Sequence, residues 1–299
     1  MLNILDLIFL TLAAAVTFTG VLIHKYESHL PAFVIKGYKY GSFAYQGSGG
    51  NFLQAIEIPK AYYRHFYLFS TIYSVVTLIY MLAVYYLDYG VSKYIQMIHK
   101  LILEQDGPSI SAVAALIAMS LITVQCLRRF YETYYLQVFA KSSKMNLSHY
   151  LAGIIHYFED NSKYKLFINL GQNIVWIDLY TKVIAIPCIL AFLWCWYEQY
   201  QSNVIFANLR KDKKTGKVVT EEHRVPHGRM FEKVSSPHRM CEVLMYTVLV
   251  FLVPTKTFIC IYLWVLGNQL QTAIQAHEWY KKTFKNYPAE RRLILPGVF

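Results

Sequence analysis

Arginines and turn-forming residues recur together through one long polar segment, residues 198–238. Lys214-Thr215-Gly216-Lys217 predicts a turn between two extended pieces, Pro226 and Gly228 predict a second bend, and Ser235-Ser236-Pro237 leads into the next apolar run. Guanidinium groups grip phosphate oxygens in pairs, so arginines spaced among ordered turns suit a polyphosphate ligand. The alternative is an ordinary basic loop that attracts anionic lipid, and composition alone favours that alternative.

A second group of polar residues falls in or beside apolar runs, where each charge needs a partner or a function. Asp178 and Lys182 stand at i and i+4 of a predicted helix, a spacing that favours an ion pair. Asn268, Thr272 and Gln275 share one face of the last apolar run. We expect that face to look into the bundle or a water-filled cavity, or else to form hydrogen bonds between helices.

The composition behind these residues is that of a membrane protein. Of 299 residues, 56% are hydrophobic and 16% aromatic, and only 16% are charged, whereas soluble domains carry about a quarter charged residues. This excludes a disordered chain, a disulfide-stapled secreted module and a nucleic-acid-binding domain. The five cysteines form no CxxC pair and no metal-ligand spacing, so the sequence predicts that they pack as hydrophobic side chains and hold no metal.

Seven apolar runs are long enough to cross, or nearly cross, a bilayer core of about 30 Å. The fourth is short and the last two share a tight hairpin at Pro254-Thr255-Lys256, so six to eight spans fit the pattern and seven fits best. The predicted fold is an all-α, multi-pass transmembrane bundle that forms one integral membrane domain, residues 1–299. The runs cover residues 4–24, 66–87, 110–127, 147–158, 174–197, 239–254 and 256–275.

The basic residues give this bundle an orientation. With seven spans, most of the 29 lysines and arginines flank loops on one side, and such residues stay on the cytosolic side. The N-terminus is therefore predicted to be lumenal and the C-terminus cytosolic. The same asymmetry explains the net charge of +11 without nucleic acid. The sequon Asn146-Leu147-Ser148 falls at a cytosolic edge, so we expect it to carry no glycan.

Specific strings resemble the steroid 5α-reductase family. The cofactor-binding signature of that family is similar to Asn208-Leu209-Arg210-Lys211, His223-Arg224-Val225-Pro226-His227-Gly228, the stretch from Phe231 to Pro237, and Glu242. Its C-terminal motif resembles His277-Glu278-Trp279-Tyr280-Lys281 and the residues that follow. Two upstream strings resemble the polyprenol reductase branch of the family, namely the stretch from Glu57 to Tyr67 and Leu127-Arg128-Arg129-Phe130-Tyr131-Glu132.

The resemblance implies an endoplasmic reticulum enzyme that uses NADPH to saturate the α-isoprene unit of a polyprenyl lipid in dolichol synthesis, which supports protein N-glycosylation. Residues 198–238 would form a cytosolic NADPH-binding loop, and residues 239–299 would complete the cofactor site. Cofactor phosphates would bind Arg210 and Arg224. The remaining cofactor-binding residues implied by the family motif are Asn208, His238, Glu242, His277 and Tyr280, of which the last three would contact the nicotinamide half or its ribose.

The resemblance also assigns catalytic candidates. Glu57 falls where the family has an acidic residue close to the reacting carbonyl, and His238 replaces the usual Asn. Cys126 stands where the steroid-reducing members have a catalytic Tyr. Tyr135 is the substitute proposed as proton donor, because it shares a helix face with Arg128 and Glu132. Arg129 is expected to join Glu57, Glu242 and His277 at the cytosolic ends of the helices.

Chemistry narrows the substrate. Hydride is a nucleophile and needs an electron-poor alkene, which an α,β-unsaturated aldehyde provides and an allylic alcohol does not. A donor must stabilise the enolate oxygen that forms, and a proton must reach the α carbon. We therefore expect polyprenal to be the direct substrate, with an alcohol or aldehyde dehydrogenase acting in the same pathway. The alternatives are a steroid 3-oxo-Δ4 reductase, an enoyl-CoA reductase, and a non-enzymatic lipid transporter or scaffold.

Overall fold

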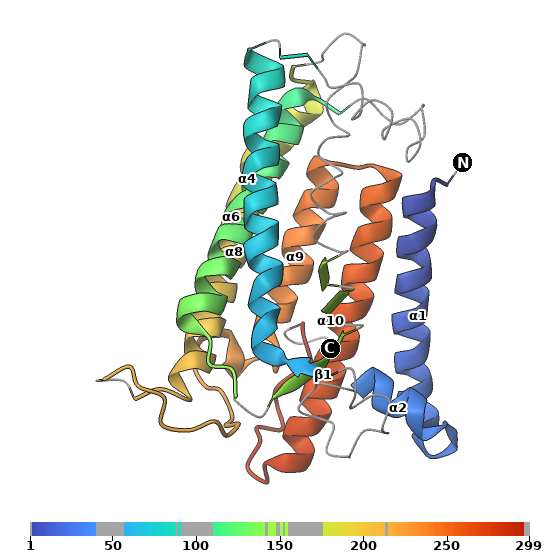
Figure 1. The fold of residues 1–299 in the computed structure, drawn as a ribbon, viewed down its shortest axis with the longest axis vertical. Coiled ribbons are helices and arrows are strands. Elements are labelled where there is room, and N and C mark those ends of the chain that lie inside the picture. Colours follow the sequence, from blue (N-terminus) through green and yellow to red (C-terminus); the bar gives the residue numbers. More distant parts are fainter. Residues whose placement is uncertain are drawn as a thin grey trace.

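Long apolar helices dominate the described part of the chain (Figure 1). The computed structural model describes residues 2–39, 57–87, 89–90, 110–140, 143–147, 150–151, 153–154, 176–212 and 215–295. Five helical stretches within these ranges are long and apolar enough to cross a membrane, and α9 is a shorter companion. The five are built on α1 (Ile4–Tyr26), α4 (Arg64–Tyr86), α6 (Ala112–Tyr131), α8 (Leu179–Asn208) and α10 (Lys256–Thr283), and α9 covers Pro237–Leu252.

These helices confirm the predicted multi-pass helical membrane fold. Six of the seven predicted runs coincide with a described helix, and most of the run at 147–158 lies outside the described residues. The smaller elements are the helix α2 (Ala32–Lys39), the 3₁₀ turns Glu27–His29, Lys60–Tyr63 and Arg229–Glu232, and a π-helical turn at Glu132–Leu136. Two short strands also occur, β1 (Glu57–Pro59) and β2 (Lys144–Asn146), and they pair antiparallel.

Polar side chains fix where several helices begin. Asn3 and Asp6 form a reciprocal capping box at the start of α1. Ser111 caps α6 and also contacts the Thr181 hydroxyl of α8 at 2.9 Å. Thr255 caps α10 directly after the tight hairpin from α9. Each cap satisfies a backbone N–H that has no partner within its helix.

Three sequence-based expectations need correction. Asp178 accepts the backbone N–H of Thr181 at 2.6 Å as the N-cap of α8, and the described residues show no ion pair between Asp178 and Lys182. Residues 198–208, predicted as loop, continue α8. Asn268 is exposed, so its face of α10 is not the inward one. The buried residues of α10 include Gly267 and Gln271 on one side and Ala273 and Tyr280 on the other.

The helices pack in pairs, α8 on α9, α1 on α10 and α4 on α6. Gly20 and Gly267 lie where α1 and α10 approach closely. A Cβ atom on Gly267 would be 2.6 Å from Thr17 Oγ1, so only glycine fits without a shift. All five cysteines are free and buried, which confirms that they pack as hydrophobic side chains.

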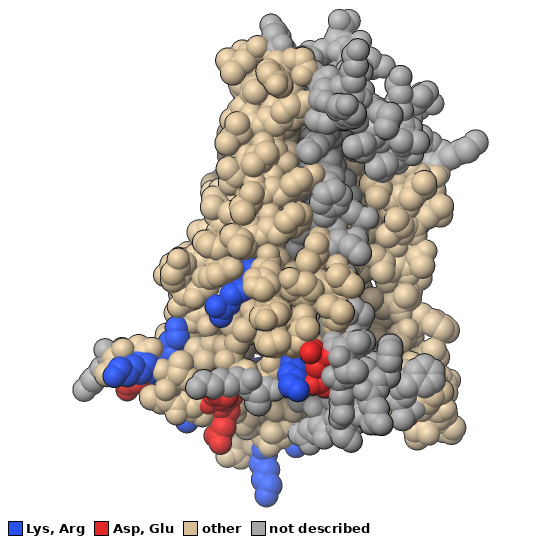
Figure 2. Space-filling model, viewed as in Figure 1, with Lys and Arg blue, Asp and Glu red and all other residues tan. Residues whose placement is uncertain are grey.

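The basic segments meet at one end of the bundle, where α1, α6, α8 and α10 finish and where α4 and α9 begin (Figure 1). Figure 2 shows the lysines, arginines and carboxylates of one face in the lower half of the molecule, below a surface of uncharged residues. Lys214 lies outside the described residues, and the rest of the turn predicted at residues 214–217 is present, with Gly216 at a φ of 68° and the Asp212 carboxylate accepting from Thr215. A second bend occurs at Gly228, whose φ is 95°.

The close approach of α1 and α10 predicts a test of stability. Gly267→Val forces branched carbon atoms against Thr17, and overpacking of this kind costs about 1–3 kcal/mol. We expect a lower unfolding temperature in detergent, measured by the loss of monodisperse protein on heating. Ala15→Val, on the exposed side of α1, is the matched control and should leave that temperature unchanged. Equal unfolding temperatures for the two variants would contradict the proposed close contact.

Candidate functional site

A fully buried carboxylate, Glu132, lies at the basic end of α6. Its two oxygens form ion pairs with Arg128, at 3.4 Å from Nε, and with Arg129. Asn203 of α8 also donates to Glu132 Oε2, at 2.9 Å. An unpaired charge at this depth would cost several kcal/mol, so the three partners hold the carboxylate and the two cations in fixed positions.

Two glutamines extend this network to α9. Arg128 Nη2 donates to Gln125 Oε1 at 2.8 Å and also to the side-chain oxygen of Gln199, Oε1. Gln125 Nε2 then donates to Gln199 Oε1 at 3.0 Å and to Glu242 Oε2 at 3.2 Å. Gln199 Nε2 donates to the same Glu242 oxygen and to the backbone carbonyl of His238. The amide groups therefore fix the orientation of the Glu242 carboxylate.

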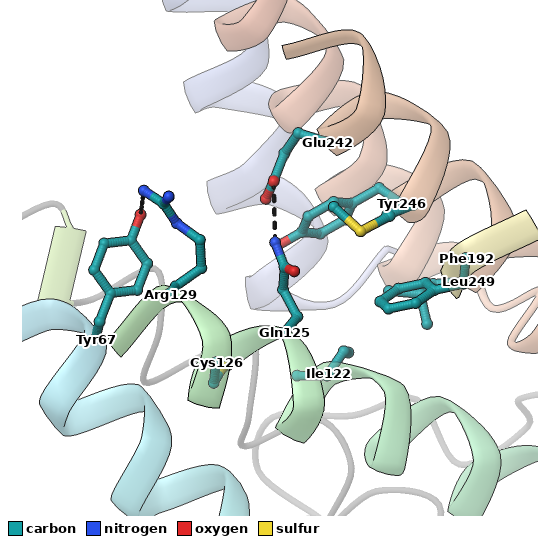
Figure 3. Close-up of a pocket in the computed structure, with 10 residues that line it drawn as sticks. Tyr67, Ile122, Gln125, Cys126, Arg129, Phe192, Glu242, Tyr246 and Leu249 are labelled. Carbon is teal, nitrogen blue, oxygen red and sulfur yellow. Dashed lines mark hydrogen bonds between the residues drawn. The ribbon is translucent and has the colours of Figure 1, made fainter. Parts of the chain in front are cut away.

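A cavity of about 30 Å³ lies between α4, α6, α8 and α9, with room for about two water molecules. Its polar end carries Tyr67, Arg129 and Glu242, and its apolar end carries Phe192 and Leu249 (Figure 3). The apolar residues lie deeper in the bundle, farther along their helices from the basic end. The cavity therefore changes from charged to hydrocarbon character with depth. The remaining lining residues are Ile122, Gln125, Cys126, Met245 and Tyr246.

The last described residues close over the start of α9. Backbone groups of Val234 and Arg292 form a parallel bridge, in which Ser235 N donates to Arg292 O at 2.8 Å. The Ser235 hydroxyl contacts His277 Nδ1 and accepts from the Tyr287 hydroxyl at 2.6 Å. Tyr280 stacks on Tyr287 with ring centroids 5.4 Å apart. The tail thus fixes His277 and Tyr280 beside residues 234–236.

Arg210 lies at the other edge of this region, just beyond the end of α8. Its Nη1 donates to the backbone carbonyl of Val138 at 2.9 Å, and its Nη2 lies 3.3 Å from His223 Nδ1. Desolvation, with the neighbouring Arg210 and Lys60 charges, lowers the pKa of His223 to about 4. His223 is therefore neutral at physiological pH and can accept a hydrogen bond from Arg210.

Several buried polar atoms near the tail and the start of α9 have no hydrogen-bond partner in the described part of the chain. They are Ser236 Oγ, His238 Nδ1, Arg239 Nε, and Nε and Nη1 of Arg291. Buried polar groups are normally paired, and two of these four side chains are guanidinium groups. The set suits an anionic, hydrogen-bonding ligand such as a dinucleotide.

The structure brings some predicted site residues together and separates others. Glu242 and Arg129 line the cavity, whereas Glu57 lies on β1 with its carboxylate 2.9 Å from Lys144 Nζ. Tyr135 is 67% exposed and stacks on Tyr131, outside the cavity lining. Of the three residues predicted to share a helix face, Arg128 and Glu132 do contact each other, as an ion pair. Asn208 and Arg224 are exposed at the basic end. Which of these residues act in a reaction stays a prediction.

Sequence reasoning missed four residues of the site: Tyr67, Gln125, Gln199 and Asn203. The sequence predicts a loop at Gln199 and Asn203, whereas they lie one helical turn apart on the inner face of α8. Their burial among charged groups could have been suspected from the spacing of polar residues after an apolar helix. Tyr67 belongs to a tyrosine-rich stretch in which nothing marks one ring above the others.

The chain is a multi-pass membrane protein. Its unpaired polar atoms suit an anionic ligand, and the neighbouring cavity suits an apolar one. Residues 143–299 match the family described as 3-oxo-5-alpha-steroid 4-dehydrogenase. The chain is 34% identical over 306 residues to polyprenal reductase of Drosophila melanogaster, covering 99% of this chain and 93% of that protein. The polyprenal reductases of Caenorhabditis elegans and Homo sapiens are 29% and 26% identical, over 87% and 82% of this chain and 85% and 79% of their own lengths.

The chain therefore belongs to the steroid 5α-reductase family, described as 3-oxo-5-alpha-steroid 4-dehydrogenase. Membership makes it an oxidoreductase of a family that uses a nicotinamide cofactor. The resemblance inferred from short strings is confirmed at the level of the whole chain.

Removal of the buried carboxylate gives a second prediction. Glu132→Ala leaves Arg128 and Arg129 unneutralised inside the bundle, and the loss of one partner of a buried ion pair costs about 3–5 kcal/mol. We expect a marked fall in the unfolding temperature in detergent. Glu222→Ala, which removes an exposed carboxylate, should change it little. A Glu132→Ala protein as stable as the Glu222→Ala protein would show that the network does not stabilise the fold.

Proposed function

We propose that this chain is a polyprenal reductase, which uses NADPH to reduce the α-isoprene double bond of polyprenal in dolichol synthesis. The observation that carries the proposal is the cavity whose lining changes from polar to apolar with depth, in a chain that resembles polyprenal reductases over nearly its full length. A polyprenal has the same asymmetry, with one carbonyl at the end of a long hydrocarbon. Its aldehyde would lie near Tyr67, Arg129 and Glu242, with the hydrocarbon directed toward Phe192 and Leu249.

The cofactor would bind at the basic end. Arg210 and Arg224 are proposed to bind phosphates, with Asn208 and His238 nearby in the same region. Glu242, His277 and Tyr280 are proposed to contact the nicotinamide half or its ribose. The oriented Glu242 carboxylate supports this, because it lies at the boundary between the unpaired polar atoms and the cavity. In this proposal residues 198–238 and 239–299 form one cofactor site within a single membrane domain.

The chemistry divides between cofactor and protein. NADPH supplies a hydride when bound. The protein must hold the carbonyl, stabilise negative charge on its oxygen and deliver a proton to the α carbon. Arg129 at the polar end of the cavity supplies positive charge at that point, and the apolar lining excludes water from the alkene. Glu57 and Tyr135 stay as predicted catalytic residues, although neither lines the cavity.

The site sets where the reaction must take place. Moving a chain of isoprene units from lipid into water costs about 0.8 kcal/mol per methylene. A charged dinucleotide does not enter the lipid. We propose an endoplasmic reticulum membrane location, with the basic end of the bundle and the C-terminus in the cytosol and the N-terminus in the lumen. A dehydrogenase that interconverts alcohol and aldehyde would supply polyprenal and consume dolichal.

Phosphate recognition gives a third prediction. Arg210→Ala and Arg224→Ala should each weaken NADPH binding by about ten- to a hundredfold, because a charge-assisted hydrogen bond is worth about 1.5–3 kcal/mol. NADH affinity should fall less for whichever arginine contacts the 2′-phosphate. Titration of purified protein with each cofactor measures both effects. Lys217→Ala removes a positive charge from the same loop and should bind normally. Equal losses in all three variants would indicate only general attraction by a basic loop.

Substrate oxidation state gives a fourth prediction. Purified protein with NADPH should convert polyprenal to dolichal and leave polyprenol untouched, because only the aldehyde makes the double bond electron-poor. An added alcohol dehydrogenase should then restore the consumption of polyprenol. A 3-oxo-Δ4 steroid is the third substrate in the panel and should not be reduced. Direct reduction of polyprenol without a dehydrogenase, or preference for the steroid, would overturn the proposed substrate.

A further inference from the structure

The hydroxyl of Ser235, just before α9, makes three polar contacts with groups from separate segments of the chain. Its oxygen lies 2.5 Å from His277 Nδ1 on α10 and 2.6 Å from the hydroxyl oxygen of Tyr287 in the tail. The backbone carbonyl oxygen of Arg292 is 3.1 Å away. Ser235 is 2% exposed, so solvent has little access to these contacts.

A count of protons gives each contact a direction. A serine hydroxyl has one proton and two lone pairs. The Arg292 carbonyl only accepts, so the Ser235 proton points toward it, and the Tyr287 hydroxyl donates to the Ser235 oxygen. The second lone pair of that oxygen then accepts from His277, whose Nδ1 must carry a proton. This assignment is the one that makes all three contacts hydrogen bonds.

Backbone contacts and aromatic rings hold this acceptor in place. Ser235 N donates to the same Arg292 carbonyl at 2.8 Å, and Arg292 N donates to the Lys233 carbonyl at 3.0 Å. The Tyr287 ring stacks on Tyr280 and meets the His277 ring edge-on, with centroids 5.4 and 6.0 Å apart. A half-turn of the imidazole would put a ring carbon beside the Ser235 oxygen, and the hydrogen bond to Nδ1 would be lost.

The position of this proton decides what the other nitrogen of His277 offers. In a neutral imidazole one ring nitrogen carries the proton and the other is an acceptor. With the proton on Nδ1, Nε2 has a lone pair, and the hydrogen bonds of the described residues give it no donor. A ring held in this form accepts from O–H and N–H groups at Nε2. The opposite tautomer would present an N–H there and would accept from none of them.

We propose that Ser235 is a positioning residue that holds His277 as the Nδ1–H tautomer, so that Nε2 accepts a hydrogen bond from the nicotinamide half of NADPH. The inference rests on the proposed function, which brings His277 to that half of the cofactor. Two kinds of group there have a proton to donate, the ribose hydroxyls and the carboxamide NH₂, and each needs an acceptor when it leaves water. Ser235 acts through His277, while Tyr287 occupies the other lone pair of its oxygen.

The tautomer is tested in purified protein without cofactor. Nitrogen NMR of isotope-labelled histidine, at a pH where the ring is neutral, separates protonated from unprotonated ring nitrogens, and His277→Gln identifies the His277 signals. Nδ1 should carry the proton in the unaltered protein. Ser235→Ala should move the proton toward Nε2, because nothing then accepts from Nδ1. Ser235→Thr, which keeps a hydroxyl, and Tyr287→Phe, which keeps the Ser235 acceptor, should both retain Nδ1–H.

Cofactor affinity supplies the second measurement. Ser235→Ala should weaken NADPH binding about three- to tenfold, the effect of one neutral hydrogen bond, and Ser235→Thr should restore it. Ser74→Ala removes a buried hydroxyl that bonds within its own helix, α4, and should bind NADPH normally. The acetylpyridine analogue of NADPH has a methyl ketone in place of the carboxamide. A loss that disappears with this analogue identifies the carboxamide as the donor, and a loss that persists identifies a ribose hydroxyl.

The two measurements keep this inference separate from the proposed function. A proton on Nε2 in the unaltered protein, or the same tautomer in Ser235→Ala, overturns the inference. Equal NADPH affinity in Ser235→Ala and the unaltered protein refutes it as well, and a loss of affinity without a change of tautomer would reflect packing alone. In each of these cases, reduction of polyprenal by the unaltered protein leaves the proposed function standing. If the unaltered protein neither binds NADPH nor reduces polyprenal, the proposed function itself fails.

Discussion

The Glu132 carboxylate, which is closed to solvent, and the two guanidinium groups bound to it determine the arrangement of the basic end of the bundle. None of these charges can change position alone, because an unpaired charge at this depth costs more than most single contacts contribute. Arg128 transmits the constraint through the glutamines to α9, and Arg129 transmits it to α4. The π-helical turn that begins at Glu132 widens α6 at this point, and such turns occur frequently at functional sites.

Much of the fold was predictable because the thickness of the bilayer sets the length of apolar runs and charge asymmetry sets the placement of lysine and arginine. A run of apolar residues must be helical in lipid, since its backbone groups have no other partners. The turn at Gly216 was also predictable, because glycine beside polar residues favours the positive φ that Gly216 adopts. The strings that resemble the family were recognisable because particular residue types recur at fixed spacing. These features depend on local sequence alone.

The rest depends on contacts between distant segments. An i, i+4 spacing allowed an ion pair between Asp178 and Lys182, but the carboxylate gains more by capping the first turn of α8. Polar periodicity marked a face of α10 without showing which neighbour it meets, and the inward face proved to be that of Gly267 and Gln271. Tyr67 could not be chosen from a stretch of tyrosines, since only its distance to Arg129 distinguishes it.

The buried cysteines have a practical consequence for labelling. All five are free thiols with little or no solvent access, and thiol reagents attack the exposed thiolate. A single cysteine introduced at an exposed site such as Lys217 would therefore be the chief target of a membrane-impermeant maleimide. Fluorescent or spin probes could be attached there without first removing the native thiols. Because packing keeps the native thiols from reacting, the unaltered chain can be labelled at one introduced cysteine. Such labels would report which side of the membrane each loop occupies.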